Sequence, residues 1–168
     1  MQPGDITTWG VDWAWGMPLI ILTVIFHAYG LGLVNRDVTL RLKHSVESRL
    51  TFVSVVVIGG VALAATMLHG LEAISWALTY RFIKALPDFK SAMLYSMSAI
   101  TSYGHANLYL EPRWQMMGTL EALDGWILFG LTTAFLFAII QKAWSSHSGP
   151  NRVTEGMLPL RSSNGESC

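Results

Sequence analysis

Charged residues are scarce in this sequence. Of its 168 residues, 13% are charged and 52% are hydrophobic, and the mean hydropathy is +0.41, whereas about a quarter of the residues of an ordinary soluble domain are charged. A soluble domain is therefore excluded, and we expect an integral membrane protein. The 11 basic and 11 acidic residues cancel without forming a basic run, so the sequence offers no polycationic surface and no nucleic-acid partner.

Cysteine and catalytic motifs are also lacking. The single cysteine, Cys168, allows neither a disulfide framework nor a cysteine metal site within one chain. The sequence contains no phosphate-binding glycine loop, nucleophile elbow or zinc-binding helix motif. It also lacks the regularly spaced arginines of a voltage sensor. We therefore expect no enzyme and no cofactor.

Basic residues are missing from the first 13 positions, which carry Asp5 and Asp12, so this stretch does not look like a signal peptide and the apolar run after it is expected to be kept. There are three long apolar stretches, at residues 13–34, 50–86 and 116–144. Each can cross a hydrocarbon core of about 30 Å, and the second is long enough to tilt or project. We expect three transmembrane helices.

Four of the 11 basic residues lie within residues 35–49, between the first two apolar stretches. The positive-inside rule places this connection in the cytoplasm. The N-terminus is then expected outside the cell inner (plasma) membrane and the C-terminus in the cytoplasm. Residues 145–168 are rich in Ser, Gly, Asn and Pro and are expected to form a disordered tail.

The segment between the last two apolar stretches is too interrupted to cross a membrane. Pro87 and Asp88 are typical of a helix start and predict a short apolar helix up to residue 100, too short to span. The polar sequence TSYGHAN follows at residues 101–107. Non-helical backbone at membrane depth is tolerated only where it is buried in protein or lines a water-filled cavity. Because helix C-termini and consecutive carbonyls both favour cations, the pattern predicts a re-entrant pore loop.

This order of outer helix, pore helix, filter and inner helix resembles the pore module of tetrameric potassium channels, and it is similar in detail to the small bacterial two-helix ion-channel family. The matching stretches begin HGLEAISW, LPDFKSAM and EPRWQMMG, at residues 69–80, 86–96 and 111–142. The resemblance implies an all-α membrane protein with a re-entrant pore helix and filter, assembled as a homotetramer that conducts monovalent cations. The domains expected are an N-terminal transmembrane helix and loop (1–48), a pore domain (49–144) and the tail (145–168).

The family's filter, Thr-Thr-x-Gly-Tyr-Gly-Asp, aligns without a gap on residues 101–107. On this register Thr101 and Ser102 match the threonine pair, Tyr103 the variable position, Gly104 the first glycine, His105 the tyrosine, Ala106 the second glycine and Asn107 the aspartate. The resemblance implies ion coordination by residues 101–106, with potassium or sodium held at Ser102, Tyr103, Gly104 and His105, and support from Asn107. A second register, pairing residues 102–105 with Gly-Tyr-Gly-Asp, needs a deletion and a compensating insertion.

Two substitutions in this filter carry functional expectations. Ala106 stands at a glycine position, and an alanine at positive φ costs about 1–2 kcal/mol, so the upper filter is expected to be wider or more mobile. Four protonated His105 side chains around one axis would repel cations. We therefore expect weak selectivity for potassium over sodium and inhibition by external acid. Two alternatives stay open: a degenerate pore that does not conduct, and an accessory membrane subunit.

Acidic residues of the helices are expected to support the filter. Glu121 matches a family position and is expected to brace the pore loop, whereas Asp124 either faces the vestibule or forms a structural ion pair. His69 and Glu72 share a helix face. We expect them to pack against Glu121 or the pore helix rather than to bind an ion.

Small and aromatic residues have further expected roles. Gly125 and Gly130 either form a gating hinge or permit close helix packing. Thr132 either lines the pore or bonds its own helix backbone, as its neighbour Thr133 also can. Trp76 and Tyr80 are typical of interfacial anchors.

His27 keeps another class of function open. The simplest reading is a buried, hydrogen-bonded histidine on the first helix, which is expected to pack outside the second. With His69 it can also form a bis-histidine haem anchor. That alternative requires both rings at one depth, and the expected topology puts His27 nearer the cytoplasm and His69 nearer the outside.

Overall fold

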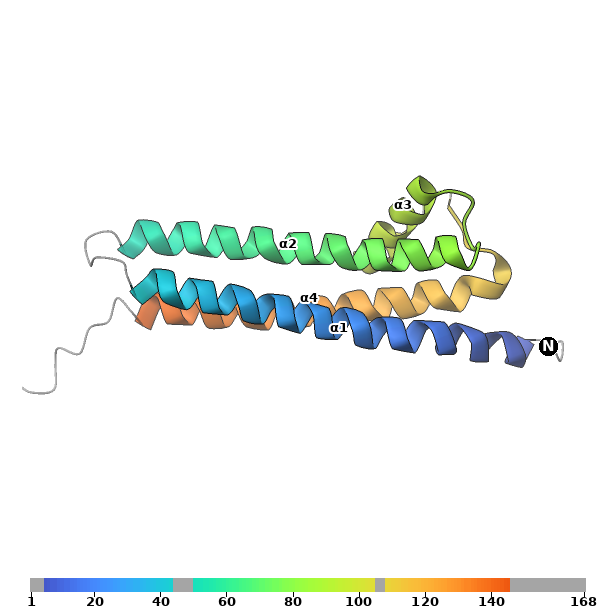
Figure 1. Cartoon of the computed structure of the whole chain (residues 1–168), viewed down its shortest axis with the longest axis horizontal. Helices are drawn as coiled ribbons and strands as arrows, with labels where there is room; N and C mark the ends of the chain where they lie inside the picture. Colours follow the sequence, from blue (N-terminus) through green and yellow to red (C-terminus); the bar gives the residue numbers. More distant parts are fainter. Residues whose placement is uncertain (1–4, 44–49, 105–107, 146–168) are drawn as a thin grey trace, which may run out of the picture.

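The computed structural model describes residues 5–43, 50–104 and 108–145, and in these residues the fold is helical and contains no strand. Three long helices, α1 (Asp5–Lys43), α2 (Leu50–Phe82) and α4 (Gln115–Ser145), run side by side (Figure 1). The short helix α3 (Phe89–Ile100) and the 3-10 turn η2 (Pro112–Trp114) lie between α2 and α4 in the chain.

Each long helix is long and apolar enough to cross a membrane. The candidate spans are Trp9–Leu40, Val55–Phe82 and Pro112–Lys142. Large apolar side chains such as Leu22, Leu63 and Phe137 are exposed on their outer faces, as lipid contact requires. The sequence-based prediction of three such helices is confirmed.

Helix α1 continues past its expected end. Residues 35–43 were expected to belong to a loop but are helical. Val38 is buried in an apolar cluster with Ile139 of α4, and Lys142 Nζ donates a hydrogen bond of 2.6 Å to the Thr39 hydroxyl. These contacts with α4 stabilise the added turns, and they cannot be read from the polar composition of the segment.

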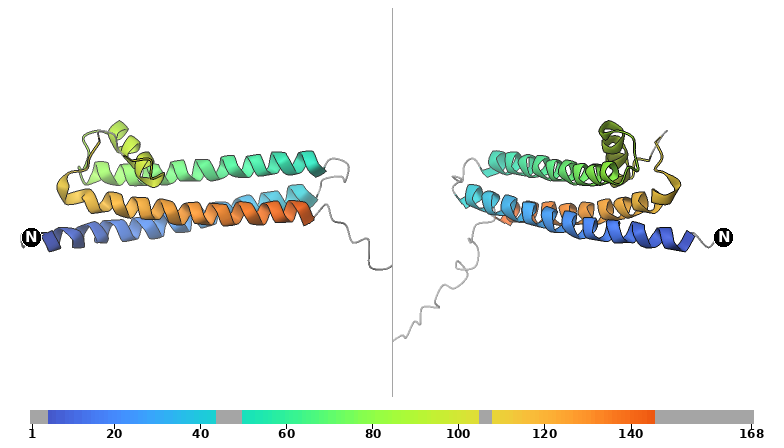
Figure 2. Two further views of the ribbon diagram at one scale, coloured as in Figure 1. Left: turned by 180° about the vertical axis from the view of Figure 1, so that it is seen from behind. Right: turned by 45° about the vertical axis from the view of Figure 1, so that its right-hand side comes forward.

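The three long helices share one core. Ile20 of α1, Trp76 of α2 and Leu120 of α4 belong to the same buried cluster. Helix α1 therefore packs against α4 as well as α2, and not simply outside α2 as the sequence suggested (Figure 2).

Helix α3 begins where the sequence predicts. Asp88 is its N-cap, and its carboxylate accepts hydrogen bonds from the backbone amide (2.9 Å) and hydroxyl (2.7 Å) of Ser91. These bonds lower the pKa of Asp88, because they favour its charged form. The helix lies at the end of the bundle where α1 begins and is inclined to the long helices (Figures 1 and 2).

Candidate functional site

Helix α3 ends in a Schellman motif. The Ser102 amide donates to the Ala99 carbonyl and the Tyr103 amide to the Ser98 carbonyl, each at 2.9 Å, which are the two bonds of that motif. Ser102 has φ 53° and takes the left-handed position that glycine usually occupies. Gly104 follows with φ 90°, so the conformational freedom expected of this glycine is used.

In a single protomer, the residues that directly follow α3 are exposed. Residues 101–104 are all exposed, and Tyr103 is 86% exposed. Among the residues that the structure describes, no backbone amide donates to the carbonyls of residues 101–104. The Thr101 hydroxyl donates to the Met97 carbonyl of its own helix at 2.6 Å. The other predicted filter residues, His105, Ala106 and Asn107, lie outside the described part of the chain.

The C-terminal end of α3 lies against α4 at Gly125. A Cβ built on Gly125 would collide with the Ile100 carbonyl oxygen, so this glycine permits close packing of α3 on α4. Gly125 is ten residues past Gln115, or about 15 Å along the helix axis. A Cβ built on Gly130 would meet nothing within 4 Å, so only Gly125 is needed for this contact.

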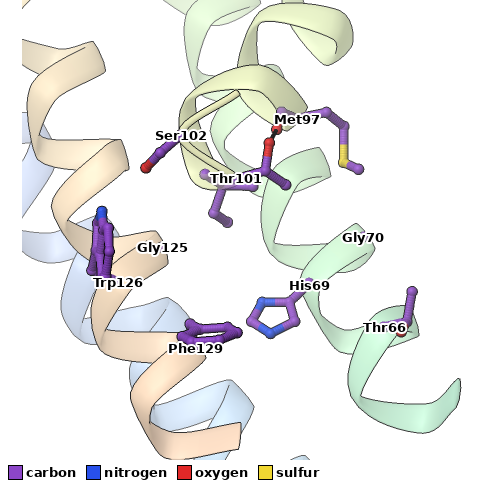
Figure 3. A pocket seen from close by; sticks show the side chains of 10 residues that line it. Thr66, His69, Gly70, Met97, Thr101, Ser102, Gly125, Trp126 and Phe129 are labelled. Atoms are coloured by element: carbon purple, nitrogen blue, oxygen red, sulfur yellow. Dashed lines mark hydrogen bonds between the residues drawn. The ribbon is translucent and has the colours of Figure 1, made fainter. Parts of the chain in front are cut away.

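A pocket of about 450 Å³ lies beside the turn, between α2 and α4. In Figure 3, Thr101 and Ser102 border it on the side of α3, and His69 and Phe129 lie across from them. The described lining contains no lysine or arginine.

Glu121 links α3 to the long helices. Its buried carboxylate accepts a hydrogen bond of 2.7 Å from the Tyr80 hydroxyl and also contacts the Ser96 hydroxyl, which lies 2.7 Å from the Ala73 carbonyl oxygen. The sequence predicted that Glu121 braces the pore loop, and its contact with Ser96 is made to the helix that precedes residues 101–107.

Two aromatic residues were assigned wrongly from the sequence. Trp76 and Tyr80 were expected to be interfacial anchors, but both are fully buried. Trp76 Nε1 donates to Asp124 Oδ2 at 3.0 Å, and Tyr80 donates to Glu121. Each ring has a buried acidic partner for its polar atom, and such partners permit full burial.

Asp124 also differs from expectation. It is fully buried, so it does not face a vestibule. Its Oδ2 accepts hydrogen bonds from the Thr23 hydroxyl (2.8 Å) and from Trp76, both of which are neutral. The ion pair that the sequence suggested is not among the salt bridges of the described residues.

Four side chains from the three long helices form a closed polar ring. His27 of α1 places Nδ1 2.6 Å from Glu72 Oε1 and Nε2 2.9 Å from Thr132 Oγ1. His69 of α2 places Nε2 3.3 Å from Thr132 Oγ1 and Nδ1 3.2 Å from Glu72 Oε2. His27, Glu72 and Thr132 are buried, and the His69 side chain is 27% exposed. We call this set the His-Glu-Thr ring.

The ring overturns two sequence-based expectations. Glu72 and His69 were expected to contact Glu121 or the short helix, but their described polar partners are His27 and Thr132. His27 and His69 were expected at different depths, but their ring centroids are 5.0 Å apart. Because α1 spans residues Asp5–Lys43 and α2 spans Leu50–Phe82, both histidines lie near the middle of their helices.

The same geometry argues against a bis-histidine haem. A haem requires a flat macrocycle between its two axial imidazoles. Here the two rings are close neighbours at 5.0 Å, and Glu72 and Thr132 occupy the positions beside their nitrogens. In this arrangement the imidazole nitrogens contact Glu72 and Thr132 and do not face each other across a gap.

Comparisons of the chain with protein-family models, with curated proteins and with solved structures find no match. The class that the fold defines is an all-helical protein with three helices able to span a membrane. Within that class, the features that bear on a particular activity are the end of α3 and the buried polar groups.

Proposed function

We propose that the chain is the subunit of a homotetrameric, potassium-channel-like channel for monovalent cations in the cell inner membrane. Its N-terminus lies outside and its C-terminus in the cytoplasm. The observation that carries the proposal is the exposed, non-helical backbone of residues 101–104, which follows the point where α3 meets the interior of α4.

Depth along α4 supports this proposal. Ile100 contacts Gly125, about 15 Å from the start of a helix whose candidate span is Pro112–Lys142. In lipid, each unsatisfied backbone group costs several kcal/mol, so carbonyls at this level need a protein or water partner. Among the described residues of one protomer, no backbone amide donates to these carbonyls, whereas four copies around one axis supply both a protein wall and a wet path.

The charge pattern favours cations. The C-terminus of α3 carries a partial negative charge and points toward residues 101–104. Successive carbonyl oxygens there can replace the hydration shell of an ion. The adjoining pocket presents Thr101 and Ser102 and no lysine or arginine. Weak selectivity and acid inhibition, expected from Ala106 and His105, belong to the same proposal.

The test is ion flux into liposomes that contain the purified protein, in potassium and in sodium gradients at two external pH values. We expect flux of both ions, reduced at the lower pH, from particles whose native mass is that of four chains. Tetramers without flux would contradict the channel and favour an accessory subunit. Particles that never reach four copies would contradict the assembly.

The substitution Gly104→Ala makes the ion-flux test more specific for the filter. Because Gly104 has φ 90°, alanine there costs about 1–2 kcal/mol in each subunit, or about 4–8 kcal/mol per tetramer. We expect the flux to fall about tenfold or more while the native mass is unchanged, since about 1.4 kcal/mol already corresponds to a factor of ten. The matched control is Gly59→Ala, at a helical position where a Cβ meets nothing within 4 Å. Equal flux from the two variants would contradict a filter at residues 101–104.

A further inference from the structure

We infer that His27, His69 and Glu72 form a binding site for a divalent transition-metal ion of the zinc type inside each protomer. The inference does not depend on the proposed channel, because all three ligands belong to one chain. It also differs from the packing role that the sequence suggested for His69 and Glu72.

The ligand atoms already have nearly the required spacing. One donor atom from each of the three side chains lies within 4.8 Å of the other two. A tetrahedral zinc ion with bonds of about 2.0–2.1 Å holds its ligands about 3.3 Å apart. His69 Nδ1 is 3.2 Å from Glu72 Oε2, and His27 Nδ1 is 2.6 Å from Glu72 Oε1. The contact between His27 Nδ1 and Glu72 Oε1 is about 0.7 Å shorter than this ligand separation, so these two groups must move apart when the ion binds.

Hydrogen-bond counting shows that the His-Glu-Thr ring is incomplete without a cation. Its four contacts need four protons, but two neutral imidazoles and one hydroxyl supply three, and a carboxylate supplies none. Glu72 Oε2 is buried, and His69 Nδ1, 3.2 Å away, does not meet it with hydrogen-bond geometry. Either an added proton or a metal ion can complete the ring.

A metal ion on the Nδ1 side satisfies both imidazoles and the carboxylate. Both histidines then carry their proton on Nε2, and both Nε2 atoms face Thr132 Oγ1, at 2.9 Å and 3.3 Å. A hydroxyl oxygen has two lone pairs and can accept both bonds. Thr132 thus orients the two imidazoles, as the outer partners of metal-bound histidines commonly do.

The donor set and the access path define the type of ion. Two imidazole nitrogens with one carboxylate oxygen are the ligands of zinc sites that keep a fourth position for water, and related sites hold ferrous iron. The partly exposed His69 side chain borders the pocket beneath α3 (Figure 3), so water and ions reach the site from there.

The experiment uses full-length protein in detergent, purified without a histidine tag, stripped with chelator and titrated with Co²⁺ as a spectroscopic probe. We expect one Co²⁺ per chain by elemental analysis, with the intense visible absorption of four-coordinate Co²⁺, and displacement of that absorption by Zn²⁺. A metal content well below one per chain, or Co²⁺ with only the weak spectrum of the hydrated ion, would overturn the site.

Variants separate this site from adventitious binding. His69→Ala and Glu72→Gln should abolish the visible spectrum, and Thr132→Val should weaken Co²⁺ binding about 10–100-fold, as loss of an outer partner does. The control replaces His44 and His147, two histidines that belong to neither proposed site, by alanine and should keep full binding. If the Glu72→Gln variant does not fold, the His69→Ala variant still tests the site, because His69 is partly exposed. Equal binding by His69→Ala and the wild type would refute the inference, and Co²⁺ binding by a protein without ion flux would refute only the channel.

Discussion

At the scale of single residues, Gly125 decides how closely α3 approaches α4. The Ile100 carbonyl lies where a Cβ of residue 125 would be, whereas the space around Gly130 is open. Two glycines on one helix, five residues apart, therefore have different structural roles. The contact at Gly125 is the reason that α3 ends beside the interior of α4 and not at its end.

This difference predicts unequal effects of alanine. Gly125→Ala should force α3 away from α4 at a cost of about 1–3 kcal/mol, the range for overpacking, and lower the melting temperature in detergent by about 2–10 °C. Gly130→Ala should leave the melting temperature unchanged or raise it slightly, because alanine is more favourable than glycine in a helix by up to about 1 kcal/mol. Equal melting temperatures for the two variants would contradict the contact.

The sequence revealed which residue types lie in the helices but not their partners. His27 could be predicted to be buried and hydrogen-bonded, yet its partners Glu72 and Thr132 lie on two other helices. Such contacts depend on how each helix is rotated about its axis. Rotation is set by packing, and a helix that is apolar on most sides gives little indication of which face turns inward. Trp76 was misplaced for that reason.

At the scale of elements, the Ser96 hydroxyl gives α3 a polar attachment within a largely apolar surface. Tyr95 and Ala99 lie in the main buried cluster, and Ser96 is the α3 residue that reaches Glu121. Glu121 belongs to α4 and Ala73 belongs to α2. Because the Ser96 hydroxyl contacts both residues, it connects α3 to both long helices.

Removing that hydroxyl should weaken the attachment of α3. Ser96→Ala leaves a buried Glu121 oxygen without its partner, and we expect a loss of about 1–3 kcal/mol in the free energy of unfolding. The matched control is Ser98→Ala, two residues further along, whose hydroxyl donates to the Leu94 carbonyl of its own helix. That change should stay within about 0.5 kcal/mol.

Unfolding of both variants in detergent, followed by circular dichroism, gives the comparison. Faster hydrogen exchange of α3 in Ser96→Ala, with α1 unchanged, would locate the effect. A loss of similar size in Ser98→Ala would contradict the role assigned to the Ser96 contact.

Element boundaries were predictable where local chemistry sets them. The Pro87–Asp88 pair fixes the start of α3 through the Asp88 cap, and long apolar runs fix the three spanning helices. Residues 35–43 were misassigned because their helix is stabilised by contacts with α4, including Val38 with Ile139. Tertiary contacts of this kind override a polar local sequence.

At the scale of the whole molecule, the exposed surfaces are of two kinds. The outer face of α1 carries large apolar side chains such as Leu22, 59% exposed, and suits lipid. Near the end of α3 the exposed surface is the polar turn at residues 101–104. In the proposed tetramer, the polar backbone exposed at that level is satisfied by other copies of the chain, whereas the face of α1 needs only lipid. The two surfaces should therefore have different neighbours in the assembled protein.

Cross-linking distinguishes these neighbours. In a Cys168→Ser background, Tyr103→Cys should give cross-linked pairs of subunits with a short bis-maleimide in native membranes, because four copies of residue 103 surround one axis in the proposed tetramer. Leu22→Cys has a comparably exposed side chain on α1 and should give few or none, because its neighbours are lipids. A direct disulfide needs Cα atoms within about 7 Å, so the bis-maleimide tests proximity without demanding that geometry. Efficient pairing through residue 22 with none through residue 103 would place α1, and not the turn after α3, between subunits, and the proposed arrangement of the pore would then be wrong.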